Sequence, residues 1–276
     1  MINLKTSISA IEELLQKNTN ASLTYAALEC RLAIERICYE RLRLNHDYIS
    51  HDDLKKWQPQ DIVRTLIQEV DANTAETFTL SISKEPLADT SKSPTLEEYQ
   101  ATEFVSIGTQ IGFNPKKLGK FWNALAKLAL HISLPVNKND SVTHYGDIEK
   151  IRMKVIEVLH EIKQIDKGTL MISGIGEQVS FECICKSKNQ RRLELLKNGQ
   201  VISCINPECN ETYTYNSNDK SFERRTIDVI CQNCDNKTDI PKKIIERLRT
   251  EQSLRFNCEF CGEKNLLAWR LMQAKK

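Results

Sequence analysis

Eight of the ten cysteines fall in four close pairs in the C-terminal third of this 276-residue chain, and no other feature limits the fold as much. Two cysteines at a tight turn can present both sulfurs to one metal ion. Two such turns complete the tetrahedral four-sulfur shell that structural zinc prefers. The spacing therefore predicts two structural zinc ions. The predicted ligands are Cys183, Cys185, Cys204, Cys209, Cys231, Cys234, Cys258 and Cys261.

An internal repeat indicates which pairs share an ion. A basic, helix-like run followed by a strand-like run precedes both the second and the fourth pair, over residues 189–204 and 240–258. This repeat favours two sequential zinc ribbons, one ion for the first two pairs and one for the last two, over an arrangement in which the pairs alternate. All-cysteine sites leave no open position for water or substrate, so we predict no zinc catalysis.

The residues after three of the pairs also fit metal-binding turns. Asn210, Asp235 and Gly262 each tolerate a left-handed backbone, which lets the chain turn so that amides face the sulfurs. The first pair, Cys183 and Cys185, is separated by a single residue. We therefore expect its site to be the less regular of the two.

A change in composition near residues 166–168 predicts a domain boundary, because apolar residues recur with helical spacing before it and short strand-like runs, at 169–173 and 178–184, follow it. The predicted fold class is α + small β. It consists of a mainly α-helical bundle over residues 1–167 and tandem zinc ribbons over residues 168–276, divided near residue 222.

Five helices are predicted in the first domain, starting near Ser7, near Ser22, at Pro59, at Pro115 and at Asp147. The second runs to about residue 44, with Asn20 or Ser22 as its cap. It has two apolar stripes and should be covered on two sides. The stripes are Ala26, Cys30, Ile34 and Ile37, and Leu28, Leu32, Tyr39 and Leu42.

The remaining features of the first domain are less regular. Cys30 and Cys38 lie in the helical pattern and are predicted to be buried small hydrophobes rather than ligands. Phe78, Leu80 and Ile82 alternate like a strand, and residues 84–94 read as a loop, so an insertion of undetermined form is expected between the third and fourth helices.

The segment LTYAALECRLAIERICYERL, residues 23–42, resembles the long early helix of HEPN-type domains, compact helical bundles widespread in bacterial defence and toxin systems. The resemblance covers residues 1–165 at most. It implies a dimerising bundle and, in active members, metal-independent RNA cleavage by an arginine and a histidine that usually belong to a later helix. Here the later helices offer His131 and His144, but no arginine lies between Arg64 and Arg152. This departure weighs against catalysis and leaves the bundle unaffected.

Arg41 and His46 are the remaining catalytic candidates. Four residues separate Arg41 from His46. An arginine and a histidine at about this spacing occur about once by chance in a chain with this many of each, so the spacing alone does not assign an activity. Arg41 also continues the stripe that ends at Ile37, so its guanidinium should point toward the packed side and needs a partner there. We predict that the protein alone does not cleave RNA.

The charge distribution of residues 168–276 bears on possible partners. The 18 Lys or Arg residues exceed the 14 Asp or Glu residues, but eight thiolates and two zinc ions would cancel the excess. Basic residues nevertheless cluster in both repeats, with Tyr213, Tyr215 and Trp269 as stacking platforms. The alternative is that the charges solvate helix faces and the aromatics pack small cores. The candidate nucleic-acid-binding residues are Arg191, Arg192, Lys242, Lys243, Arg247, Arg249 and Arg255.

Three functions are compatible with these patterns. The leading one is a nucleic-acid-binding zinc protein, with RNA favoured over DNA, a homodimer through the helical domain, and a role in bacterial stress or phage defence. The alternatives are a HEPN-like ribonuclease that uses Arg41 and His46, and a protein-interaction adaptor with structural zinc. No N-terminal signal pattern and no apolar run long enough for a bilayer is visible, so a cytoplasmic protein without a membrane partner is expected.

Overall fold

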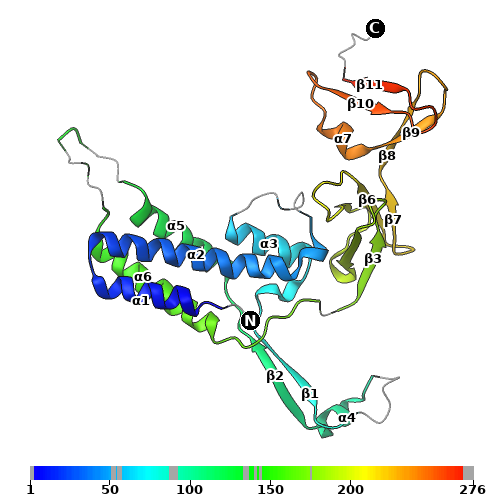
Figure 1. The fold of residues 1–276 in the computed structure, drawn as a ribbon. Coiled ribbons are helices and arrows are strands. Elements are labelled where there is room, and N and C mark those ends of the chain that lie inside the picture. Colours follow the sequence, from blue (N-terminus) through cyan, green and yellow to red (C-terminus); the bar gives the residue numbers. More distant parts are fainter. Residues whose placement is uncertain are drawn as a thin grey trace. The chain divides into compact units, whose positions relative to one another are not determined.

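The computed structural model describes residues 3–50, 54, 58–86, 93–132, 137–139, 142, 145–174 and 176–269. The chain divides into two compact units (Figure 1). The first comprises Met1–Asn45 and Lys56–Ile175, and the second comprises His46–Lys55 and Gly176–Lys276. Among the described residues, no helix combines the length and the apolar character needed to cross a lipid bilayer.

The long helix α2 (Asn20–Leu44) is the centre of the first unit (Figure 1). Four helices and a π-helical turn contact it: α1 (Lys5–Lys17), α3 (Pro59–Glu69), α5 (Pro115–Leu125), η3 (Ala126–Leu130) and α6 (Ile148–Asp166). The five helices predicted from the apolar spacing are therefore confirmed, with α5 passing into a π-turn where a continuous helix was expected.

Local polar residues fix where these helices begin. Thr19, rather than Asn20 or Ser22, is the N-cap of α2, and its side chain accepts a hydrogen bond from Ser22 N at 3.1 Å. Ser22 Oγ in turn accepts from Thr19 N at 2.9 Å, which completes a capping box whose cap lies one residue before Asn20 and three before Ser22. Pro59 and Pro115 stand in the first turns of α3 and α5, as their fixed φ favours.

The burial of α2 agrees with one predicted stripe and corrects the other. Ala26, Cys30, Ile34 and Ile37 are fully buried, but Leu28 and Leu32 remain 36% and 46% exposed. The neighbours instead cover Leu23 and three small residues against which they can pack closely: Ala27, Ala33 and Cys38. Cys30 and Cys38 are both buried, as predicted, and this burial raises the pKa of each thiol to about 12.

The predicted strand at residues 78–82 is confirmed as β1 (Phe78–Ser83). Its antiparallel partner β2 (Phe104–Gln110) and the short helix α4 (Leu96–Ala101) between them were not predicted. A bulge between Leu80 and Ser81 interrupts the register of the hairpin. Residues 87–92 of the predicted loop lie outside the described residues.

In its described residues, the second unit consists of short antiparallel sheets, one α-helix and 3-10 turns. Its four-cysteine groups belong to two parts, called here the first module (residues 178–224) and the second module (residues 226–269). The first module contains β3 (Gln178–Glu182), β4 (Lys188–Arg192), η4 (Leu193–Leu195), β5 (Val201–Ser203), β6 (Thr212–Asn216) and β7 (Ser221–Arg224). The second contains β8 (Thr226–Ile230), β9 (Lys237–Pro241), α7 (Lys242–Arg247), β10 (Ser253–Asn257) and β11 (Lys264–Ala268).

Two sequence-based expectations differ from the structure near this unit. Residues 169–173 form no strand and belong to the first unit, where Leu170 N donates to Thr109 O at 3.1 Å and Ile172 N to Gln110 Oε1 at 3.3 Å. The helix-like run of the first repeat is β4 followed by η4, because pairing with β3 buries Arg191 and Arg192. The corresponding run of the second repeat is helical, as predicted.

Candidate metal centres

The first module brings the sulfurs of Cys183, Cys185, Cys204 and Cys209 together, all within 4.8 Å of one another. The first pair lies on the turn after β3, and the second pair lies on the connection between β5 and β6. The Sγ atoms of Cys183 and Cys209 are 3.7 Å apart, and those of Cys185 and Cys204 are 3.6 Å apart. The first two pairs therefore face one centre, as the sequential arrangement requires.

The turns of this module differ from the predicted ones. Lys186, rather than Asn210, adopts the left-handed conformation, with φ 69°. It closes the tight turn in which Lys186 N donates to Cys183 O at 2.8 Å. The pair at Cys204 and Cys209 is separated by four residues, so the chain reverses before the second cysteine, and Cys209 N donates to Asn206 O at 3.0 Å. The turn at Cys183 and Cys185, which are separated by a single residue, thus requires Lys186 to adopt a strained backbone conformation.

The second module brings Cys231, Cys234, Cys258 and Cys261 together through two equivalent turns. One follows β8 and the other follows β10. In each, the amide after the second cysteine donates to the carbonyl of the first: Asp235 N to Cys231 O at 3.1 Å and Gly262 N to Cys258 O at 2.9 Å. Asp235 and Gly262 have φ 57° and 74°, which confirms the left-handed positions predicted for them.

The spacing of the sulfurs fits a tetrahedral metal ion. A metal–sulfur bond of about 2.3 Å in a regular tetrahedron places the sulfurs about 3.8 Å apart. The cross-pair separations in the second module, Cys231 to Cys261 and Cys234 to Cys258, are both 3.7 Å. The described cysteines outside these groups, Cys30 and Cys38, lie buried in α2. Each four-cysteine group could therefore hold one metal ion.

Hydrogen-bond donors around three of the sulfurs, those of Cys185, Cys231 and Cys258, favour the thiolate form that metal binding needs. Backbone amides of Cys261 and Phe260 lower the pKa of Cys258 to about 6, and those of Asn233 and Cys234 lower the pKa of Cys231. In the first module, burial raises the pKa of Cys185, but hydrogen bonds with Ser187 outweigh it and the net pKa is about 6. Burial raises the pKa of Cys204 and Cys209, and the pKa of Cys234 is also raised.

No protein-family model, curated protein or solved structure matches the chain. The function of the chain is therefore argued below from its own residues.

The basic candidates of the first module have structural roles. Arg192 is 1% exposed, donates to Gly176 O at 3.0 Å and to the Tyr48 hydroxyl at 3.1 Å, and lies over the Tyr48 ring at 4.6 Å. Arg191 is 4% exposed and donates to Ser203 O at 3.3 Å. Both guanidinium groups are thus enclosed by the second unit.

The tyrosines of the first module are buried as well. Tyr213 donates its hydroxyl to Cys183 Sγ at 3.2 Å and packs against Phe181, whose ring also contacts Phe222. Tyr215 is 2% exposed and packs against Phe222. These rings form the core beneath the first centre, so they are not stacking platforms for bases. The aromatic residues exposed in the second module are Phe260 and Trp269, at 65% and 52%.

The basic candidates of the second module are mostly accessible. Lys243 is buried at 6% exposure, and Lys242 is half-buried, both in the first turn of α7. Arg247, Arg249 and Arg255 are exposed. The sequence identified these cations by composition but missed Phe260, which stands between the cysteines of its turn, and Lys264 on β11.

The catalytic candidates lie in different units. Arg41 is 2% exposed in the first unit, where its guanidinium donates to Gln110 Oε1 and, at 3.3 Å, to Ile111 O. His46 belongs to the second unit, and 62% of its side chain is exposed. Arg41 thus points inward, as predicted, and has found its partner in Gln110. His131 is exposed, and His144 lies outside the described residues.

Proposed function

We propose that the protein is a structural-zinc protein that binds single-stranded nucleic acid, RNA in preference to DNA, through its second module. The observation that carries this proposal is the outward face of the β10–β11 hairpin, on which cations lie beside exposed apolar and aromatic side chains. Zinc is the proposed metal because four thiolates in a closed tetrahedral shell are its preferred structural environment.

The register of the hairpin defines this face. Arg255 pairs with Leu266 and Asn257 pairs with Lys264, and each of the four side chains is exposed while its neighbours along the strand are half-buried. Phe260 is exposed on the turn that joins the two strands. Cations that follow a phosphate backbone and an aromatic ring that stacks on bases are the combination used for sequence-tolerant binding of single strands.

A second exposed ring extends this surface toward α7. Trp269 follows β11 and donates its indole N–H to Ile245 O at 3.4 Å, so the ring lies against the helix that carries Arg247. Net charge does not drive this proposal, because several cations of the module are paired with carboxylates, including Lys237 with Asp228 and Arg225 with Glu246.

We expect salt-dependent binding of single-stranded RNA by the full zinc-loaded protein. The Arg255→Ala/Lys264→Ala double variant should reduce the magnitude of the slope of log affinity against log salt by about 1.4, since each phosphate contact contributes about 0.7. Phe260→Ala should weaken binding about 5- to 150-fold and leave that slope unchanged, because stacking releases no counterions. Fluorescence anisotropy with RNA and DNA of one sequence measures both effects.

The matched control removes two exposed lysines from the first module, in the Lys188→Ala/Lys197→Ala double variant. It should leave the slope nearly unchanged. An equal loss in both double variants would show that the β10–β11 face is not the site. Absence of binding at low salt would refute nucleic-acid binding altogether.

One observation favours a homodimer, formed through a hairpin of the first unit. The β1–β2 hairpin is two-stranded and exposes apolar side chains, including Ile82 (58%), Val105 (47%) and Ile107 (55%). Isolated two-stranded ribbons are marginally stable, and exposed strand edges readily pair with another chain. We propose as a second candidate that this hairpin packs against its counterpart in a second copy.

Light scattering should then give a mass near twice the 31.7 kDa of one chain. Val105→Lys should return the protein to a monomer, since it places a charge on the face where Ile82 and Val105 pair. Ser106→Lys, on the opposite face of the same strand, should leave the dimer intact. A wild-type mass of one chain at all concentrations, or equal dissociation of both variants, would exclude this interface.

A further inference from the structure

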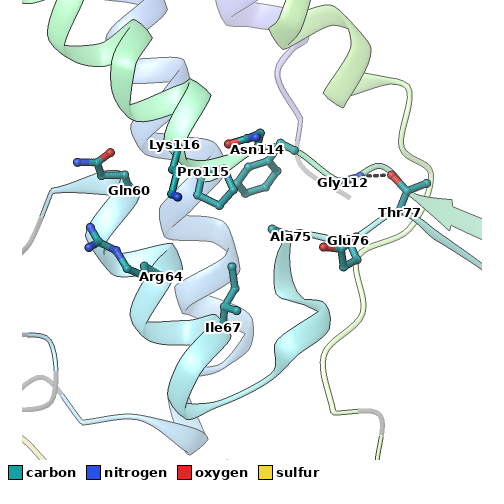
Figure 2. A pocket seen from close by; sticks show the side chains of 11 residues that line it. Gln60, Arg64, Ile67, Ala75, Glu76, Thr77, Gly112, Asn114, Pro115 and Lys116 are labelled. Atoms are coloured by element: carbon teal, nitrogen blue, oxygen red, sulfur yellow. Dashed lines mark hydrogen bonds between the residues drawn. The ribbon is translucent and has the colours of Figure 1, made fainter.

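A pocket with a cavity volume of about 870 Å³ opens in the first unit (Figure 2). Its walls come from α3, from the residues that lead into β1, and from the residues that lead into α5. Its size lies in the range of small-molecule sites, which extends from about 300 to 1,000 Å³. Neither the metal centres nor the β10–β11 face contributes to it.

The walls are held together by contacts that leave little room for collapse. Phe113 N donates to Ala75 O at 2.9 Å, and Gly112 N donates to Thr77 Oγ1 at 2.8 Å. A Cβ on Gly112 would come within 2.4 Å of Ala75 O, so this close approach requires glycine. On the other side, Gln60 packs directly on Gly119 of α5. The pocket is therefore part of the fold rather than a gap between loosely packed helices.

The residues that line the pocket differ in chemistry from one end to the other. Figure 2 shows Gln60 and Arg64 of α3 on one side, with Lys116 pointing from the start of α5 toward α3, while Glu76 and Thr77 lie on the opposite side. Apolar lining is contributed by Ile67, Ala75, Phe113 and Pro115. One end thus carries cations, the other end carries a carboxylate and a hydroxyl, and apolar side chains complete the walls.

The cationic end is suited to a phosphate. Lys116 is exposed and is the second residue of α5, so the positive end of that helix dipole adds to its field. Arg64 forms an ion pair with Asp61 through one terminal nitrogen. A guanidinium has five N–H donors, so Arg64 can donate to a phosphate while it remains paired with Asp61.

We propose that this pocket binds a ribonucleoside 5′-monophosphate or a ligand of that size and chemistry. Its phosphate lies between Arg64 and Lys116, its base lies against the apolar walls, and the amino or imino donors of the base face Glu76 and Thr77. Thr77 Oγ1 already accepts from Gly112 N, so its hydroxyl proton can be given to a base acceptor. The three parts of such a ligand match the three parts of the lining.

Calorimetric titration of the full zinc-loaded protein with each of the four common ribonucleoside 5′-monophosphates tests the proposal. At least one should bind with one-to-one stoichiometry, and both its free nucleoside and inorganic phosphate should bind at least about ten-fold more weakly. Lys116→Ala should weaken binding about 10- to 100-fold without changing the melting temperature, because one charge-assisted contact is lost from an exposed side chain.

Two controls fix the location of the site. Lys120→Ala removes an equal charge one turn further along α5, away from the pocket, and should leave the affinity unchanged. The Arg255→Ala/Lys264→Ala variant should also bind normally, which separates this site from the proposed nucleic-acid surface. The proposal is overturned if no monophosphate binds, if phosphate or nucleoside alone binds as tightly, if Lys116→Ala and Lys120→Ala behave alike, or if the Arg255→Ala/Lys264→Ala variant loses binding.

Discussion

Removal of the metal with a chelator should unfold both four-cysteine modules and leave the helices of the first unit folded. Structural zinc contributes about 10 to 16 kcal/mol to small domains, which exceeds the stability that such domains have without it. The purified protein should contain two equivalents of zinc by elemental analysis. Hydrogen exchange should then show loss of amide protection in β3 to β11 on chelation, with protection retained in α2 and α6.

The two modules should differ in their dependence on metal. The first has a core of Phe181, Tyr213 and Phe222 beneath its centre. In the second, the hydrophobic residue buried besides the cysteines is Ile240, among the residues that the structure describes. Cys261→Ser should therefore abolish amide protection throughout the second module, whereas Cys209→Ser should leave part of the first module protected.

A suitable control is Cys30→Ala, which removes a buried cysteine that belongs to neither centre and should retain two equivalents of zinc. Fewer than two equivalents in freshly purified wild type would count against the proposed metal content. A chelated protein that keeps the protection of its β strands would show that the metal is not structural.

Arg41→Ala should lower the free energy of unfolding of the first unit by about 2 to 4 kcal/mol. The guanidinium joins α2 to the end of β2 through Gln110, which is itself fully buried and donates to Glu76 O at 3.0 Å. Loss of the arginine removes one donor from Ile111 O and one from Gln110 Oε1. Burial lowers the pKa of Arg41 to about 10, so the side chain remains charged at neutral pH. The Arg41→Ala substitution would therefore leave a cavity lined by polar groups that had been paired with this charge.

Denaturant titration followed by helical circular dichroism measures this loss. Arg43→Ala is the matched control, because that side chain is 71% exposed and paired with Glu40, and its removal should change stability by no more than about 0.5 kcal/mol. Equal effects of the two variants would contradict a structural role for Arg41.

The burial of Arg41 also bears on the alternative that the protein is a HEPN-like ribonuclease. Metal-free RNA cleavage needs a base near the ribose hydroxyl and a cation near the phosphate, both on one accessible site. Since Arg41 is enclosed by its own unit, we expect no cleavage when the zinc-loaded protein is incubated with a range of RNAs. Cleavage by wild type that is lost in His46→Ala, at equal zinc content, would establish the ribonuclease instead.

The two four-cysteine groups were predictable because their determinants are local. Each cysteine pair lies on one turn, and the divergent repeat was enough to group the pairs correctly. The conformations of Asp235 and Gly262 also follow from residue type alone. Lys186 shows the limit of this reasoning, since a left-handed lysine follows from the one-residue spacing and not from any preference of the side chain.

Burial of Arg191 and Arg192 could not be predicted, because it depends on partners distant in the sequence. From the sequence alone, Arg192 is predicted to be an exposed basic residue. Its contact with Tyr48, 144 residues earlier, is seen only in the structure. The stripe of α2 indicated that Arg41 points inward, but nothing in the sequence identified Gln110, 69 residues later, as its partner. The β2 strand was missed because its apolar residues are exposed and the bulge breaks their alternation with β1.

The contact between Tyr48 and Arg192 has a consequence for the order in which the chain is made. Tyr48 precedes its partner by 144 residues, which at ribosomal rates of about 5 to 20 residues per second means a delay on the order of 10 seconds. During that interval the helices before and after Tyr48 can already fold, while the Tyr48 ring has no arginine to pack against. Residues 46–50 can therefore dock only after β4 has been made, and a fragment that begins at residue 176 would lack them and leave Arg192 without the Tyr48 ring.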